Sequence, residues 1–298
     1  MVLHLYRMLT KFPFFLTITI VTLVVLIGLL TAIAFFGRSR WRAETTQLLT
    51  NLKAVRVPVQ PATCDPAELA DLPEPVQRYF RTVLRDKAPL ITAVDIEHTG
   101  TFNMGTTKEN WQPFTSKQWV MTQPAGFVWD ARISMFPGFT AHVHDAFVAG
   151  RGVLAAKLFG LLTVMKMPSS PQLDEGELIR YLAEAPWYPT ALLPSQGAIW
   201  QLVDDTHARA TLTSGSTTVT LTFQFDERGL IKTVRSEGRC REVKGVQVPT
   251  PWQGHYWDYQ WHDNMLVPYR GEVAWMLPEG PQPYWRGHIQ RIEYKYAE

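Results

Sequence analysis

The sequence predicts a mainly β protein of the α+β class. We expect an N-terminal transmembrane helix followed by a curved antiparallel sheet or open half-barrel with helices packed on it. Three observations predict this fold: an uncharged apolar run near the N-terminus, period-two alternation over most of the remaining chain, and turn sequences between the alternating segments. We divide the chain into a tail and transmembrane helix (1–37), a linker (38–65) and a single β-rich domain (66–298).

The apolar run extends from Phe12 to Gly37, between Lys11 and Arg38. As a helix rising about 1.5 Å per residue, it is long enough to cross the roughly 30 Å hydrocarbon core of a bilayer. A cleaved signal peptide is the alternative, because Arg7 and Lys11 would form its basic region and Ala32-Ile33-Ala34 has the small residues that a peptidase needs. We favour a retained anchor, since the run is longer than a signal peptide requires and Arg38 follows it at once.

Basic residues are more numerous after the apolar run than before it. The short tail offers Arg7, Lys11 and the amino terminus. The other flank offers five: Arg38, Arg40, Arg42, Lys53 and Arg56. Because an excess of Lys and Arg marks the cytoplasmic side of a span, we predict a single-pass protein of the bacterial inner (cytoplasmic) membrane with its soluble domain in the cytoplasm.

A reporter fused after Glu298 tests this orientation. We expect a reporter that is active only outside the cytoplasm to remain inactive at this position. An active reporter would place the domain on the external side and contradict the orientation.

The composition excludes some partners and leaves others open. The net charge is +2 and the basic residues are scattered, so we expect no nucleic acid partner. Cys64 and Cys240 match no metal or redox spacing, which favours two unpaired thiols and suits a reducing compartment. The chain has 11 Trp, 10 Tyr and 15 Phe, and an aromatic core, an interface or an apolar pocket would each explain that load. No motif predicts a cofactor.

The linker and the start of the domain contain helix and extended signals. Sequence compatible with a polar helix runs from Arg42 to Lys53, and the prolines from Val57 to Pro61 then predict extended chain. A short helix follows, with Pro75 in its first turn. Its apolar residues recur at helical spacing: Val76, Tyr79, Phe80 and Val83.

Alternating apolar residues predict the strands of the sheet, each with one buried face. The sets that share a face lie within 94–104, 127–135, 219–225, 257–261, 273–277 and 292–296. Turn sequences separate them, at 204–205, 214–216, 226–229, 263–264 and 278–281. Strands joined by such short turns predict an antiparallel meander.

Two helices are predicted to interrupt the sheet. The first, Val153–Met165, is mostly apolar and is expected to be buried or close to the membrane. The second runs from Asp174 to Ala185, where Asp174 and Glu177 could form a capping box. Pro186 ends this helix.

The second helix carries the richest set of candidate site residues. Glu177, Tyr181 and Glu184 share one stripe, and Arg180 can reach either acid at a spacing of three or four residues. Paired carboxylates can perform acid–base chemistry when their pKa values are separated. An Arg between two acids equally predicts an ion-pair network, so we assign no catalytic residue. Trp187 follows directly.

The strands add further ligand-binding candidates. Asp130 and Arg132 lie on the polar face of their strand and could bind a polar head group or be ordinary surface charges. Trp252 and Trp257 could line a ligand pocket or belong to an aromatic core, as could Trp261, Trp275 and Trp285.

His142 and His144 would face the same way on a strand, which suits two metal ligands. No third ligand is marked by the sequence, and two half-exposed strand histidines explain the pattern equally well. We therefore assign no metal site.

Several segments resemble the bacterial uncharacterised families DUF6544 and DUF6920. The resemblance covers the chain from about Leu72 to the C-terminus. It rests on the segments 72–80 (LPEPVQRYF), 126–131 (GFVWDA), 145–152 (DAFVAGRG), 177–189 (ELIRYLAEAPWYP), 251–254 (PWQG) and 284–287 (YWRG). It implies no reaction and no site residue, and it suggests likeness to half-barrel folds that hold acyl chains, as in lipoprotein carriers.

The sequence leaves three classes of function open. We favour binding of an apolar or lipid-like ligand in the curved sheet, close to the bilayer that residues 12–37 would cross. The alternatives are a hydrolase or isomerase acting on a membrane-derived substrate, with Glu184, Arg180 and Asp130 meeting in one cleft, and a scaffold for a protein partner. The signatures G-x-S-x-G, G-x-G-x-x-G and H-E-x-x-H and the P-loop are absent from the sequence.

Overall fold

The computed structural model describes residues 2–298 apart from 106–107, 137 and 244, and their side chains from residue 16 onward. Arg7 and Lys11, at the start of the predicted span, therefore lie outside the described side chains. The chain begins with α1 (Val2–Ala54), a 3₁₀ turn η1 (Pro66–Leu69) and α2 (Glu74–Val83). As the sequence predicts, Pro75 lies in the first turn of α2.

The remaining chain is a sheet interrupted by one helical insertion, α3 (Pro171–Ala183) with η2 (Ala185–Trp187), η3 (Pro189–Leu192) and η4 (Pro194–Gln196). The strands before the insertion are β1 (Ile91–Asn103), β2 (Trp111–Met121), β3 (Gly126–Phe136), β4 (Phe139–Val148), β5 (Arg151–Leu158) and β6 (Leu162–Lys166). Those after it are β7 (Ile199–Asp204), β8 (His207–Ser214), β9 (Thr217–Phe225), β10 (Ile231–Val243), β11 (Val246–His262), β12 (Met265–Leu277) and β13 (Gly280–Tyr296).

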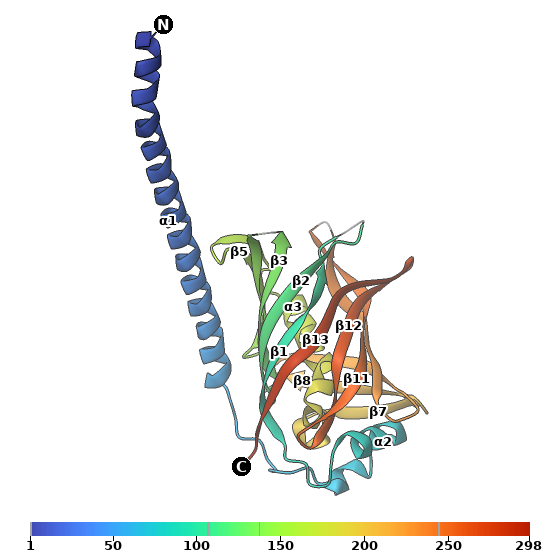
Figure 1. Cartoon of the computed structure of the whole chain (residues 1–298). Coiled ribbons are helices and arrows are strands. Elements are labelled where there is room, and N and C mark those ends of the chain that lie inside the picture. Colours follow the sequence, from blue (N-terminus) through green and yellow to red (C-terminus); the bar gives the residue numbers. More distant parts are fainter. Residues whose placement is uncertain (1, 106–107, 137, 244) are drawn as a thin grey trace.

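One antiparallel sheet contains all of these strands, in the order β6-β5-β4-β3-β2-β1-β13-β12-β11-β10-β9-β8-β7. The first and last strands pair at its centre, with Val94 opposite Tyr294 and Phe102 opposite Trp285. The sheet curls around α3, which contacts β4 and β5 on one side and β9 and β10 on the other (Figure 1). The predicted fold class, an open curved antiparallel sheet with helices packed on it, is confirmed.

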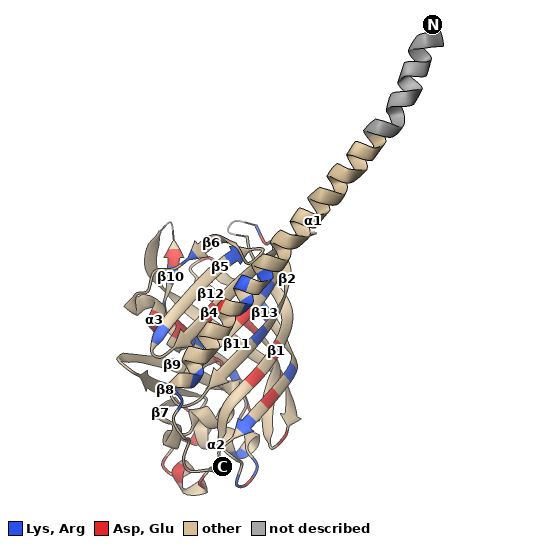
Figure 2. Cartoon of the chain, turned by 90° about the vertical axis from the view of Figure 1, so that its left-hand side faces the viewer, with Lys and Arg blue, Asp and Glu red and all other residues tan. Residues whose placement is uncertain are grey.

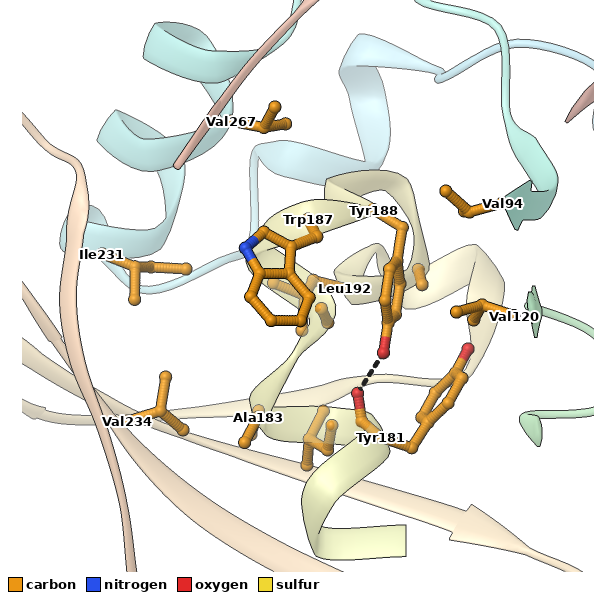
Figure 3. Packing of buried hydrophobic residues seen from close by; sticks show 14 of the residues in the cluster. Val94, Val120, Tyr181, Ala183, Trp187, Tyr188, Leu192, Ile231, Val234 and Val267 are labelled. Carbon is orange, nitrogen blue, oxygen red and sulfur yellow. Dashed lines mark hydrogen bonds between the residues drawn. The ribbon is translucent and has the colours of Figure 1, made fainter. Parts of the chain in front are cut away.

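The insertion fills the concave side of the sheet. Prolines stand at the start of η2, η3 and η4, where they break the helix after Ala183 into compact turns. Tyr181, Trp187 and Tyr188 lie between the two halves of the sheet (Figure 3), and the Tyr188 hydroxyl donates to the Tyr181 carbonyl at 2.6 Å. The core of the domain is therefore built around this segment rather than between two sheets.

The C-terminal part of α1 packs on the opposite, outer face of the sheet (Figure 2), against β2, β3 and β4. Trp41, Thr45 and Leu52 are buried there. The Trp41 ring stacks on His144 with centroids 3.7 Å apart, and Leu52 packs in an apolar cluster of the outer face. Residues 38–54, which we assigned to the linker, are thus helical and docked. The division into domains stays a prediction.

The predicted helix over Val153–Met165 is wrong, because this segment forms β5, a turn and β6. Phe159 and Gly160 have φ values of 53° and 72° and close the turn. Val153, Leu154, Ala155 and Ala156 follow one another without alternation, and a short apolar run of this kind cannot be told from a buried helix by its periodicity.

The predicted start of the second helix is also wrong. Ser170 caps α3 and accepts from the Leu173 amide at 3.2 Å. Asp174 lies inside the first turn and accepts instead from the Gly152 amide of β5 at 2.7 Å. Asp174 and Glu177 therefore do not form a capping box, and Asp174 holds the helix against the sheet.

Candidate functional site

A cluster of buried charges ties α3 to the concave face of the sheet. The Arg180 Nε donates to Glu184 at 2.7 Å, and another guanidinium nitrogen donates to Asp145 of β4. The second Glu184 oxygen accepts from Gln118 of β2 at 2.6 Å. The Arg180 guanidinium also lies over the rings of Phe127 and Trp129, 4.9 Å from each centroid. The Arg180–Glu184 pair thus joins α3 to three neighbouring strands.

Glu177 lies beside this cluster, next to the Asp145 carboxyl, and has no close cationic partner among the described residues. Its side chain is buried, one carboxyl oxygen has no hydrogen-bond partner in the described part of the chain, and the nearest cation, Arg239, is 4.0 Å away. Burial and the neighbouring Asp145 raise the pKa of Glu177 well above its ordinary value near 4.5. The neutral form of this carboxyl is therefore favoured, and it can donate a hydrogen bond.

Other polar atoms near Arg180 are buried without a partner in the described chain. Both ring nitrogens of His98 are unpaired, as are the indole nitrogens of Trp129 and Trp187. His98 lies against Trp187, with centroids 4.8 Å apart, and burial lowers its pKa to about 3. A neutral His offers one donor and one acceptor. Because unpaired buried polar atoms are costly, this group is suited to a polar partner from outside the chain.

Aromatic side chains line the same concave face nearer the strand ends. Phe102, Trp275 and Tyr284 lie within a few residues of the β1–β2 and β12–β13 turns, and all three are half-buried. Tyr284 stacks on Trp275 at 5.8 Å and meets Phe102 at 5.7 Å. Arg241 of β10 lies 5.9 Å from the Trp275 centroid. The concave face therefore has a polar centre and an aromatic border.

The structure brings several predicted site residues together. Arg180 and Glu184 form the ion pair that their spacing predicts, and Tyr181 packs on Tyr188 with centroids 5.4 Å apart. Trp187 contacts His98. Trp252 is buried, and its indole nitrogen donates to the Tyr284 hydroxyl at 2.8 Å.

The predicted convergence of Asp130 with Arg180 and Glu184 is wrong. Asp130 points to the outer face, where its two oxygens accept from Trp41 and Thr45 of α1, at 2.9 Å each. Its neighbours on β3 face the core, so the sheet separates Asp130 from α3. The hydrolase or isomerase hypothesis required these three side chains to meet in one cleft, and the structure does not bring them together.

Arg132 lies on the outer face with Asp130. Both line a shallow depression of about 180 Å³ together with charged side chains of β1 and β2, Glu97 and Lys117. The composition of this lining does not suit an apolar ligand. A second depression, of about 140 Å³, is lined mainly by charged groups of β1, β2 and β13.

Trp257 is also absent from the concave site. The side chains of Trp252 and Tyr256 face inward, and Trp257 is 38% exposed and lies against His255. Asp258, at a φ of 59°, interrupts the regular strand, and Tyr259 packs on the core again. The alternation of Trp257, Tyr259 and Trp261 on one face is therefore wrong, because this irregularity lies between the first two.

Sequence reasoning missed Asp145, Gln118, His98 and Arg239 as members of the site. The available signal was a polar residue at an inward position of an alternating strand. His98 falls within the apolar set of residues 94–104. Asp145 directly follows His144 and therefore lies on the opposite face of its strand from His142 and His144. No sequence signal brings Arg239 to Glu177, because that contact joins β10 to α3.

His142 and His144 lie on the outer face beside α1. His144 is 2.8 Å from the Thr45 hydroxyl, and burial lowers its pKa to about 4. Over the described residues, no group of three His, Cys, Asp or Glu side chains is placed to hold a metal ion. Cys64 and Cys240 are both free thiols.

A family comparison assigns this architecture to a known group. Residues 70–294 match the model of a family of unknown function, DUF6920. The chain belongs to this family. Its resemblance to DUF6544 stays a prediction. No curated protein matches the DUF6920 chain.

Solved structures with some likeness to the DUF6920 chain include two bacterial proteins. A LolA superfamily protein from Nitrosomonas europaea has a TM-score of 0.33 and 8% identity, over 74% of this chain and 92% of its own. A β-barrel-like protein of the domain of unknown function DUF1849 from Brucella abortus has a TM-score of 0.26 and 11% identity, over 69% of this chain and 99% of its own.

The raised pKa of Glu177 predicts a pH-dependent stability. The folded state keeps the Glu177 proton to higher pH than the unfolded chain, so the free energy of unfolding falls as pH rises above about 4.5. Glu177→Gln removes this dependence. We expect the melting temperature of the variant, relative to the parent, to increase between about pH 5 and about pH 8.

Glu175→Gln, an exposed position two residues away, is the matched control and should follow the parent at both pH values. A Glu177→Gln variant whose melting temperature also follows the parent would show that Glu177 is ionised in the folded protein.

Proposed function

We propose that this DUF6920 chain is a single-pass membrane-anchored protein whose concave sheet binds an amphiphilic, lipid-like molecule. One observation carries the proposal: polar atoms that find no partner among the described residues lie buried around Arg180, next to half-buried aromatic side chains on the same concave face. A molecule with one polar and one apolar end complements both parts.

The polar end would lie among His98, Trp129, Trp187 and Glu177, which together offer donors and acceptors. An anionic end is favoured. Arg180 is neutralised by Asp145 and Glu184, but Arg239 is 4.0 Å from a carboxyl whose neutral form is favoured. Arg239 also lies 5.0 Å from the centroid of Trp252, at the side of the cluster nearer the aromatic border. Its positive charge is therefore available to a ligand.

The apolar end would contact Phe102, Trp275 and Tyr284. Their half-buried rings have room for further contact, whereas the rings of Tyr181 and Tyr188 below them are fully buried. Covering these rings would release water from apolar surface, which is the main favourable term in binding an acyl chain.

The anchor is α1, which contains a candidate membrane span that the rest of the protein leaves uncovered. Retention of this helix, and a cytoplasmic position for the domain, are parts of the proposal. The support for the side is the excess of Lys and Arg after residue 37.

A protein-interaction role has one specific observation in its favour. Strand β7 is an edge of the sheet, and Ile199, Leu202 and Val203 are exposed on it. Unpaired edge strands with apolar side chains pair readily with another chain. Ile199→Lys should abolish binding of such a partner without affecting an amphiphile on the concave face; loss of both, or of neither, would contradict this second role.

Native mass spectrometry of the full chain in detergent, with deuterated palmitate as the probe, tests amphiphile binding. Trp275→Ala removes part of the aromatic border and should weaken binding about tenfold, or about 1.4 kcal/mol. Trp257→Ala removes an indole from the outer face and should leave binding unchanged.

Both variants should retain the parent's melting temperature within a few degrees, since neither indole is fully buried. Absence of a palmitate adduct on the parent, or equal losses in the two variants, would contradict a ligand site on the concave face.

A further inference from the structure

Two neighbouring hairpins carry a ridge of exposed apolar side chains at one end of the sheet. Phe136 and Phe139 flank the β3–β4 turn with ring centroids 4.1 Å apart, and Phe139 meets Phe159 of the β5–β6 turn at 5.2 Å. Leu162 and Val164 continue the ridge along β6, and Leu162 is 63% exposed. We call these five residues the rim ridge. A contiguous exposed apolar surface of this kind indicates an interaction site.

The rim ridge lies at the level where the uncharged part of α1 ends. A Cβ atom on Gly37 would lie 2.2 Å from the Phe159 carbonyl oxygen, and one on Gly160 would lie 2.6 Å from the Gly37 carbonyl oxygen. The β5–β6 turn therefore touches the helix backbone at the last residue of the apolar run. Arg38 and Arg40 follow on the helix, and both are exposed.

Contacts on the outer face fix the direction of α1 relative to the sheet. Trp41 and Thr45 are held by Asp130, and Glu44 pairs with Lys157 of β5 at 2.6 Å. From this docking site the helix continues past the rim end of the sheet (Figure 1). A membrane around the span would therefore lie on the same side as the rim ridge.

The opposite end of the sheet has a different character. Its turns include Asp226, Glu227 and Arg228 between β9 and β10, and Asp263 and Asn264 between β11 and β12. These polar turns suit water. The β3–β4 and β5–β6 turns differ from them, because exposed Phe136, Phe139 and Phe159 flank or form those two turns.

We propose that the rim ridge inserts into the interfacial layer of the same bilayer that holds α1, so that the aromatic border of the concave face adjoins the lipid. The inference rests on α1 being the anchor of the proposed function, and it adds the surface by which the domain contacts the membrane. Apolar side chains at this depth gain from leaving water, and the flanking Arg38, Arg40 and Lys166 can reach lipid phosphates.

Depth-dependent quenching tests the insertion. The full chain, with Cys64→Ala and Cys240→Ala as background, is reconstituted into vesicles of phosphatidylethanolamine and phosphatidylglycerol that contain spin-labelled lipid. A polarity-sensitive fluorophore is attached at Leu162→Cys or Phe139→Cys. Glu227→Cys at the opposite end is the water-exposed control, and Leu23→Cys within the span verifies that each preparation is inserted.

We expect emission at positions 139 and 162 to be quenched at least about twofold, and emission at position 227 to be unaffected. In vesicles whose span label is quenched, rim labels that emit as in water would overturn the proposal. Palmitate binding is measured separately in detergent. A failure of membrane insertion is therefore distinguishable from a failure of palmitate binding.

A pair of glycine variants tests whether the contact with α1 sets the depth of the rim ridge. Gly37→Leu places a side chain where the Phe159 carbonyl lies, and should reduce quenching at position 162 by about half or more. Gly28→Leu is the matched control, because a Cβ there would meet no atom within 4 Å beyond its own stretch of helix backbone. Equal quenching in both variants would show that the contact at Gly37 does not position the ridge.

Discussion

The fold depends on the contact of Arg180 with Asp145 and Glu184. The sheet is open and ends at β6 and β7. Its concave face is apolar, and the segment from α3 to η4 covers it. A buried cation is tolerated only when its charge is compensated. Arg180 finds one carboxylate on β4 and one on its own helix, which fixes how deeply and in which rotation α3 lies in the sheet.

The same contact creates the polar centre of the concave face. Around Arg180, His98 and the indoles of Trp129 and Trp187 find no hydrogen-bond partner among the described residues, and Glu177 lies beside Asp145. Polar groups of this kind reduce stability unless they are paired, so their accumulation at one place favours a role beyond packing. In our proposal, the rim ridge and the docking of α1 set how the concave face is oriented relative to the membrane.

The sequence predicts the parts of the fold that follow from local periodicity. Strands with one buried face, such as β3 and β9, are recognised because apolar residues alternate along them. The segment from Arg151 to Lys166 fails this test, since apolar residues follow one another from Val153 to Ala156 and again around Leu161 without alternation. The docking of residues 38–54 also cannot be predicted from local periodicity, because the partners of Trp41 and Thr45 lie some 90 residues further along the chain.

Candidate site residues were predictable where both members lie on one element. Arg180 and Glu184 are four residues apart on a helix, and their pairing follows from that spacing. Asp130 was misplaced because the sequence marks it as polar without stating which face α3 occupies. Trp257 was misplaced because the irregular conformation at Asp258 has no sequence signal. Arg239 reaches Glu177 only through the curvature of the whole sheet.

The most direct measurement compares two arginines that tie α3 to the sheet. Arg180 pairs in the interior, whereas Arg151 pairs with Asp174 from the surface and its side chain is 70% exposed. In the full chain in detergent, Arg180→Met should lower the free energy of unfolding by about 3–5 kcal/mol, because it leaves two buried carboxylates uncompensated. Arg151→Met should cost about 1 kcal/mol or less. Equal losses, or an Arg180→Met protein as stable as the parent, would contradict the claim that this buried contact holds the internal segment in the sheet.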